Sequence, residues 1–175
     1  MTDAPLKTPE FSYEIELGEV GRQGKVFRLA AGEDERRRVA ERLGAPSVEK
    51  LEGELRVSAT KTAIRVEGSI DADLTRECVA SLEPMQERVA EDFEIDFLRE
   101  APEPEEGEEG WETPEVHEGD RLDLGELLVQ HLSLAMDPFP RKEGAESLAE
   151  TYAPKETISP FAGLKDVLGK DDDNQ

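Results

Sequence analysis

The chain has 175 residues, and its 21 Lys and Arg against 43 Asp and Glu give a net charge of −22. This length suits one modest domain, and no run approaches the roughly 20 apolar residues of a membrane span. Because nucleic acid is itself a polyanion, the charge disfavours direct binding of RNA or DNA and favours basic proteins as partners. The N-terminus lacks the apolar run of a secretory signal, so we expect a cytoplasmic protein.

The first part of the chain predicts a strand, an ambiguous segment and a helix. Apolar and polar residues alternate over 11–18, which is typical of a half-buried strand, whereas 26–29 is too short to assign. Acids followed by arginines over 33–43 predict a helix, since this charge order suits the helix dipole. Gly44 ends that helix.

The clearest signal lies in the middle of the chain. Apolar residues occupy the odd positions of 51–59 and the even positions of 64–74. This alternation predicts two long antiparallel strands, each with one buried face. A third strand is predicted over 75–82 and is broken by Pro84, and the alternation over 89–97 predicts a fourth. The middle of the chain is therefore expected to form a meander.

Residues 124–136 predict the best amphipathic helix of the chain. Asp123 can cap it, with Glu126 at the third helical position in a box-like pairing. Pro138 stops it, because the residue before a proline avoids the helical region.

Between residues 100 and 120 lie ten acids, three prolines and three glycines, without any Lys or Arg. Like-charge repulsion and the helix and strand breakers predict a disordered acidic loop. Trp111 is a large apolar residue within this loop and could form part of a short docking segment. We also expect a flexible N-terminus over 1–8 and a flexible tail over 141–175, in which a proline at the first helical position favours a short helix over 160–168.

We predict one α+β domain over residues 9–140, with the acidic loop inserted. It consists of a twisted antiparallel sheet of five or six strands with two covering helices. The sheet could curl into a partial barrel, because long strands coil strongly. The predicted core comes from the strands and the second long helix: Phe11, Tyr13, Ile15, Phe27, Leu29, Leu55, Val57, Ile64, Val66, Ile70, Phe93, Ile95, Phe97, Leu124, Leu128 and Leu132.

Carboxylates at alternate strand positions are the first candidates for chemistry. Two groups each share a strand face: Asp71 with Asp73, and Asp92 with Glu94 and Asp96. Such groups could converge on a hard cation in a metal-dependent hydrolase. Their face is also the one opposite the apolar side, so a solvated sheet surface explains them without any catalytic function.

Zinc would need thiolate or imidazole ligands, for which Cys78, His117 and His131 are the candidates. His131 lies among leucines at helical spacing, which favours a partly buried structural histidine. Cys78 is better explained as a small buried thiol than as a nucleophile. A single cysteine also excludes an internal disulfide and a Cys-only zinc site. We therefore expect no catalytic residue, metal or cofactor.

Five segments in succession point to a known family: CVASLEP (78–84), FEIDF (93–97), DLGE (123–126), LSLAMDPFPRK (132–142) and PFAGL (160–164). Their order and spacing resemble the YceD family of large ribosomal RNA subunit accumulation proteins, in the form typical of alphaproteobacteria. The resemblance implies a non-enzymatic ribosome-biogenesis factor that supports accumulation of large-subunit (23S) ribosomal RNA. It also marks Cys78, Leu82, Glu83 and Pro84 as family-motif positions. Many relatives carry a C-x-x-C there, whereas this chain has Ser81 in place of the second cysteine, so no metal site is inferred.

Charge and resemblance together favour an indirect route to ribosomal RNA. Ribosomal proteins are strongly basic, and an acidic surface attracts them over about a Debye length, roughly 8–10 Å. Our hypothesis is a module that binds a basic ribosomal protein or large-subunit assembly factor. The acidic loop would steer the encounter, and apolar helix faces would make the specific contact. The expected partner-binding residues are Trp111, Leu127, His131, Asp137, Pro138, Phe139, Pro140 and Arg141.

Direct but local RNA contact is the alternative. Arginines form a basic strip on the first predicted helix: Arg36, Arg37, Arg38 and Arg42. Arg141 and Lys142 form a second spot. Few phosphates could be neutralised by these groups, so such binding would depend only weakly on salt.

Overall fold

The computed structural model describes residues 9–100 and 115–145. Its elements, in chain order, are β1 (Glu14–Glu16), the 3-10 helix η1 (Leu17–Glu19), β2 (Lys25–Ala30), α1 (Glu33–Leu43), β3 (Ser47–Ala59), β4 (Ala63–Glu77), β5 (Pro84–Leu98), β6 (Arg121–Asp123) and α2 (Leu124–Ala135). The helix predicted over 160–168 and most of the predicted acidic loop lie outside the described residues. Within the described part, no helix is long and apolar enough to cross a bilayer.

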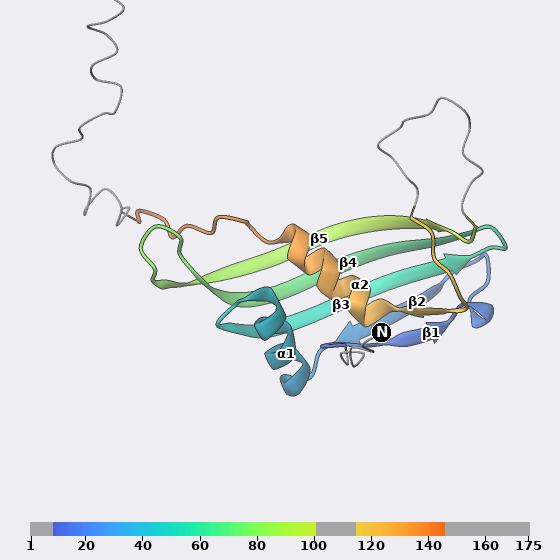
Figure 1. Cartoon of the computed structure of the whole chain (residues 1–175), viewed down its shortest axis with the longest axis horizontal. Helices are drawn as coiled ribbons and strands as arrows, with labels where there is room; N and C mark the ends of the chain where they lie inside the picture. Colours follow the sequence, from blue (N-terminus) through green and yellow to red (C-terminus); the bar gives the residue numbers. More distant parts are fainter. Residues whose placement is uncertain (1–8, 101–114, 146–175) are drawn as a thin grey trace, which may run out of the picture.

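The strands form two antiparallel sheets. The larger has the order β2-β3-β4-β5, and the smaller pairs β1 with β6. Both helices lie over the same face of the larger sheet, as Figure 1 shows. The predicted α+β class is confirmed. Across the described residues the larger sheet stays open, with β2 and β5 as its edges, and does not close into a barrel.

The first predicted strand is much shorter than its apolar alternation suggested. Only Glu14–Glu16 pairs with β6, and the chain then turns into η1, where the Leu17 N–H donates to the Asp120 carbonyl (2.8 Å). Phe11 and Ile15 are buried, as predicted, and so is Leu17, but Tyr13 is 45% exposed and does not belong to the core. Alternation reports which side chains are buried, and an irregular segment can bury the same residues without forming a ladder.

The strand predicted over 75–82 is wrong. Residues 75–77 continue β4, whereas Cys78 to Leu82 form the turn that leads into β5. Leu82 has φ +58°, and its N–H donates to the Cys78 carbonyl (2.8 Å). Cys78 and Ala80 are buried in this turn. The alternating apolar residues of this segment reflect burial in a turn, whereas the prediction interpreted them as a strand.

The core lies between the larger sheet and the helices. From β3 and β4, Leu55, Ile64 and Val66 are fully buried, and α2 adds Leu128 and Leu132. The predicted core is therefore largely confirmed. The exceptions besides Tyr13 are Phe93 and Ile95, which are only partly buried and pack against the core from the edge strand β5.

Glycines allow α2 to lie close to the sheet. A Cβ on Gly53 would lie 2.6 Å from Leu128 Cδ1, and a Cβ on Gly68 would overlap the Phe93 ring. Within α2, a Cβ on Gly125 would lie 2.8 Å from the Phe11 carbonyl oxygen. Real Cβ atoms do not approach so closely, so a larger residue at Gly53 would push α2 away from the sheet. A larger residue at Gly68 would displace the Phe93 ring on the neighbouring strand, and one at Gly125 would displace the N-terminal segment.

Candidate partner-binding surface

Helix α1 forms over the predicted residues because both of its ends are satisfied. At the N-terminus, the Gly32 N–H donates to the Glu35 carboxylate (2.7 Å). At the C-terminus, Gly44 adopts φ +63°, which glycine accepts without strain, and its N–H donates to the Ala40 carbonyl. The four arginines of the predicted RNA-binding strip are thereby fixed on one short helix.

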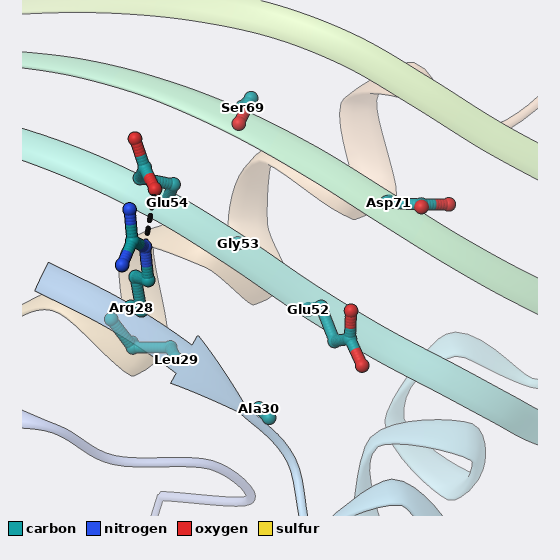
Figure 2. Close-up of a pocket in the computed structure, with 8 residues that line it drawn as sticks. All are labelled: Arg28, Leu29, Ala30, Glu52, Gly53, Glu54, Ser69 and Asp71. Atoms are coloured by element: carbon teal, nitrogen blue, oxygen red, sulfur yellow. Dashed lines mark hydrogen bonds and ion pairs between the residues drawn. The ribbon is translucent and has the colours of Figure 1, made fainter.

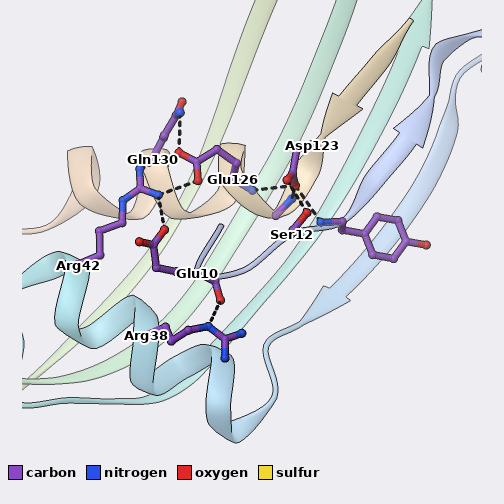
Figure 3. Close-up of polar contacts among 9 residues, drawn as sticks. Glu10, Ser12, Arg38, Arg42, Asp123, Glu126 and Gln130 are labelled. Atoms are coloured by element: carbon purple, nitrogen blue, oxygen red, sulfur yellow. Dashed lines mark hydrogen bonds and ion pairs between the residues drawn. The ribbon is translucent and has the colours of Figure 1, made fainter. Parts of the chain in front are cut away.

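Arg42, on the last turn of α1, joins that helix to α2 and to the N-terminal segment (Figure 3). Its guanidinium donates two hydrogen bonds of 2.7 Å to the Glu126 carboxylate and one of 3.2 Å to Glu10. This two-pronged geometry is the strong form of an arginine–carboxylate pair. It raises the pKa of Arg42 and holds the pKa of Glu126 below its ordinary value.

Two further arginines of the strip are also bonded within the fold. Arg38 Nε donates to the Glu10 carbonyl (3.2 Å), and Arg36 Nη1 donates to the Ala31 carbonyl (2.6 Å). Arg37 and Arg38 are both exposed, but among the described residues Arg37 alone of the four pairs only with acids of its own helix, chiefly Asp34 one turn away (2.9 Å). The strip is thus largely consumed in holding the domain together.

Asp123 caps α2, as predicted. Its carboxylate accepts from the N–H groups of Gly125 (3.0 Å) and Glu126 (3.1 Å), and also from the Tyr13 N–H and the Ser12 hydroxyl. The second half of the predicted box-like pairing is wrong, because Glu126 turns toward Arg42, a charged partner that binds more strongly than a backbone N–H. We call Glu10, Arg38, Arg42, Asp123 and Glu126 the clasp.

Two of the five family-motif segments, 78–84 and 132–142, meet at one end of the larger sheet. The Val79 N–H donates to the Pro140 carbonyl (2.9 Å), and the Lys142 N–H donates to Cys78 Sγ (3.4 Å). Lys142 Nζ also pairs with Glu83 (2.9 Å). The Ser81 hydroxyl and backbone N–H groups, including that of Lys142, lower the pKa of the Cys78 thiol.

A partly buried ion pair supports the same corner. Arg76 and Glu87 pair at 2.8 Å with only 14% and 12% of their side chains exposed. The Asp137 N–H donates to the other Glu87 oxygen (2.9 Å), and Arg76 reaches the Asp137 carbonyl (3.4 Å). Sequence reasoning missed this pair, because both residues looked like ordinary strand charges. It fixes the segment that follows α2 against β5.

The corner does not suit a metal. Cys78 brings one thiol, Ser81 supplies a hydroxyl, and neither His117 nor His131 joins them. Among residues 9–100 and 115–145, no group of three His, Cys, Asp or Glu side chains could hold a metal ion. His117 instead contacts the Arg121 carbonyl through Nε2 (2.7 Å).

The predicted partner-binding residues have different environments. Leu127 and Pro140 are buried, so their side chains are not available for contact, and Trp111 lies outside the described residues. The surface of the corner includes Phe139, which is 71% exposed, together with Asp137, Pro138 and Arg141.

His131 is half-buried, as predicted for a structural histidine. Its ring stacks on the Phe93 ring with centroids 4.1 Å apart and planes 5° apart, a contact the sequence did not reveal. Burial lowers the pKa of His131.

The sheet face opposite the helices carries the carboxylates considered for metal binding. Figure 2 shows part of it, a shallow hollow over Gly53 in which the acidic side chains stand apart from one another. Asp71 accepts from Lys50 (2.7 Å) and Arg88 (3.3 Å), and Asp96 accepts from Arg65 through two bonds of 2.7 Å. These carboxylates balance cations on neighbouring strands, which favours a solvated, charged sheet face over a hydrolase site.

These features define an α+β protein. Its charged side chains pair with one another on the sheet face opposite the helices and where α1 meets α2. A family model described as large ribosomal RNA subunit accumulation protein YceD matches residues 66–168. The chain belongs to this family, as its motifs predicted, and membership connects it with accumulation of large-subunit ribosomal RNA. Comparisons with curated proteins and with solved structures give no match. The matched region includes most of β4 and all of β5, the motif corner and α2.

Proposed function

We propose that this protein is a non-enzymatic, cytoplasmic ribosome-biogenesis factor that supports accumulation of large-subunit ribosomal RNA by binding a basic ribosomal protein or assembly factor. Contact with the RNA is then mainly indirect. The proposal joins the family connection with the distribution of free and paired charge on the domain.

The observation that carries the proposal is the fate of the arginine strip on α1. Arg42 is held by Glu126 and Glu10, and Arg36 and Arg38 are bonded to backbone carbonyls. A duplex or single strand would have to compete with these internal bonds for each phosphate contact. The strip therefore supports the fold better than it supports RNA binding.

Acidic groups are left over elsewhere. Strand β5 carries five acids and one base: Glu87, Glu91, Asp92, Glu94, Asp96 and Arg88. Within the described part of the chain, Glu91 and Asp92 form no ion pair. Such a surface attracts cationic proteins and repels phosphates, which is the electrostatic requirement of the proposed role.

Affinity purification after RNase treatment tests the proposal. A tagged full-length protein is recovered from cell extract at low salt, with and without nuclease, and its partners are identified by mass spectrometry. We expect basic large-subunit proteins or assembly factors that survive the nuclease and dissociate as salt rises. Association that disappears with nuclease, together with direct binding of ribosomal RNA fragments by the purified protein, would overturn it.

Arg37 provides the control for direct RNA contact. Because its only ion-pair partners in the described domain are acids of its own helix, Arg37→Ala removes an exposed cation without opening the clasp. Under the proposal, this variant keeps the same protein partners and supports ribosomal RNA accumulation as the unmodified chain does. A marked loss of accumulation with Arg37→Ala would favour the RNA-contact alternative.

A further inference from the structure

Strand β5, of fifteen residues, is an edge strand of the larger sheet (Figure 1). Its pairing with β4 runs without a register shift from Pro84 to Leu98. In an antiparallel strand, the N–H and C=O of one residue point to the same side, and successive residues alternate between the two sides. Once the direction of one residue's N–H and C=O groups is known, the direction of these groups is known for every residue of β5.

Leu98 supplies that direction. Its N–H donates to the Glu115 carbonyl (2.8 Å), and its carbonyl accepts from the His117 N–H (2.9 Å), so its backbone points away from β4. The next residue, Arg99, donates its N–H toward Thr62 at the β3–β4 turn, as alternation requires (2.9 Å). The even-numbered residues of β5 thus direct their backbone groups outward.

Five such residues follow one another along the middle of the strand: Arg88, Ala90, Asp92, Glu94 and Asp96. Among the described residues, none of their outward N–H or C=O groups has a backbone partner. An isolated bridge between Leu98 and Val116 pairs the end of this edge with another backbone segment, and it marks where the open part stops. An unpaired edge of this length is a template for strand addition.

A small hollow with both apolar and polar lining residues lies beside the edge on the helix-covered side. It is lined by Ile70, Glu91, Phe93, His131, Leu134 and Ala135, and its volume is about 110 Å³. This is far below the roughly 300–1,000 Å³ of small-molecule sites, but it suits a single side chain. Leu134, at its rim, is 78% exposed. A strand added to β5 would present alternate side chains to this hollow.

The charge of β5 selects the occupant. The side chains of Asp92, Glu94 and Asp96 lie on the sheet face opposite the helices. Of these three, Glu94 and Asp96 pair with Arg65, and Asp92 forms no ion pair among the described residues. A second copy of β5 would bring like charges opposite one another, which is destabilising. The other edge, β2, has six residues with two bases and no acid. The charge of the β5 edge therefore suits a basic strand better than a second copy of β5. The β2 edge, which is itself basic, does not suit a basic strand.

We propose that the open edge of β5, from Arg88 to Asp96, binds an extended basic segment of the partner protein as an additional strand. Basic side chains of that segment lie beside Asp92, Glu94 and Asp96, and alternate apolar side chains face the hollow at Phe93 and Leu134. This inference rests on the proposed function for the identity of the partner, but the edge can be tested without it.

The test uses the full chain and a fluorescent nine-residue peptide of alternating Lys and Val with blocked termini. The control peptide has the same sequence with alternate backbone nitrogens methylated, so that it keeps its charge and loses its donors. We expect anisotropy to show binding that falls roughly tenfold or more with the methylated peptide, because it loses hydrogen bonds along one side. Equal binding of the two peptides would show attraction by charge alone and overturn the inference.

Ala90 offers the matched pair of variants. Ala90→Pro removes an outward N–H, a change that edge strands tolerate and that β5 already contains at the outward position of Pro84. Ala90→Ser keeps the N–H. We expect Ala90→Pro to weaken peptide binding roughly tenfold or more and Ala90→Ser to change it less than about twofold. Indistinguishable variants would overturn the inference.

Hydrogen exchange of the unmodified chain covers the case in which Ala90→Pro does not fold. The amides of Arg88, Ala90, Asp92, Glu94 and Asp96 should exchange fast in the free protein and become protected with peptide. Protection in the free monomer would show that the chain itself covers the edge, and a concentration-dependent dimer with the same protection would show a second copy there. Either result would overturn the inference.

The native partner separates this inference from the proposed function. If Ala90→Pro retains all nuclease-resistant basic partners, the edge inference fails and the proposed function stands. If no such partner exists, yet the peptide protects the five amides, the proposed function fails and the edge inference stands.

Discussion

The clasp and the edge of β5 use charge in opposite ways. In the clasp, Arg42 joins Glu10 and Glu126, whose side chains are mostly buried, and each charge has a partner fixed by geometry. At the edge, Asp92 is exposed and forms no ion pair among the described residues. The sequence shows acids and bases in both regions, so composition does not separate them. A charge that stabilises the fold differs from one that is available to a binding partner in having an oppositely charged neighbour within the domain.

The largest effect should come from the side chain that anchors α2 between the two regions. Leu128 is fully buried over Gly53, so Leu128→Ala should lower the free energy of unfolding by about 3 kcal/mol. Leu134→Ala, on the same helix but 78% exposed, should change it by less than about 0.5 kcal/mol. Urea denaturation of both variants measures the contrast. Similar losses for the two would mean that α2 packs on the sheet differently.

Breaking the clasp should have the next largest effect. Arg42→Met removes the cation that holds the Glu126 carboxylate, and we expect a loss of about 2 kcal/mol, because Glu126 stays partly buried without its charged partner. Arg37→Met is the matched control on the same helix. Its pair with Asp34 is exposed, so the loss should stay under about 0.5 kcal/mol. Equal values by chemical denaturation would remove the distinction between bonded and free arginines in this helix.

The clasp should also give stability a pH dependence. Arg42 holds the pKa of Glu126 below its ordinary value of 4.5 in the folded protein. The resulting stabilisation is fully present above about pH 4.5 and is lost as the pH falls through the lowered folded value. The stability difference between the unmodified chain and Glu126→Gln should therefore shrink below pH 4.5.

Denaturation series at pH 7, 5, 4 and 3 measure this difference. Glu33→Gln is the control, because Glu33 is 88% exposed and lies 4.0 Å from its nearest cation. Removing this exposed charge should change the free energy of unfolding at pH 7 by less than about 0.5 kcal/mol. A difference for Glu126→Gln that persists unchanged to pH 3 would contradict the assigned pairing.

The smallest effect on stability should come from the edge. Asp92→Asn removes an exposed charge without an ion-pair partner in the described domain, so unfolding should change by less than about 0.5 kcal/mol. The same variant should weaken binding of the basic peptide and reduce its dependence on salt. Thermal unfolding and anisotropy at two salt concentrations measure the two properties together. A stability loss comparable to that of Arg42→Met would place Asp92 among the fold-forming charges.

Local signals in the sequence were sufficient for much of the fold. The helix over 33–43 and the strands over 51–59 and 64–74 were predicted because caps and alternation act between near neighbours. The prediction failed over 75–82, where the burial of Cys78 depends on a segment more than sixty residues away. Periodicity cannot distinguish a buried turn from a buried strand when tertiary contacts cause the burial.

The candidate surface was less accessible to sequence reasoning. His131 is half-buried, as predicted, but the stacked Phe93 ring depends on β5 and α2 crossing at one point. The arginines of α1 suggested an RNA-binding strip because the sequence cannot show that Glu10 and Glu126 reach them. The outward direction of the β5 backbone follows from the pairing of Leu98, which no propensity encodes.

The small sheet of β1 and β6 has a consequence for the order of folding. The β3–β4–β5 meander joins neighbours in sequence and can form as soon as it is synthesised, whereas Tyr13 must wait for Asp123, 110 residues later. Contacts of such separation cost more loop entropy and form late. During translation, β1 therefore pairs only after β6 has emerged, and the part of the meander's apolar face that α2 covers stays exposed until α2 emerges.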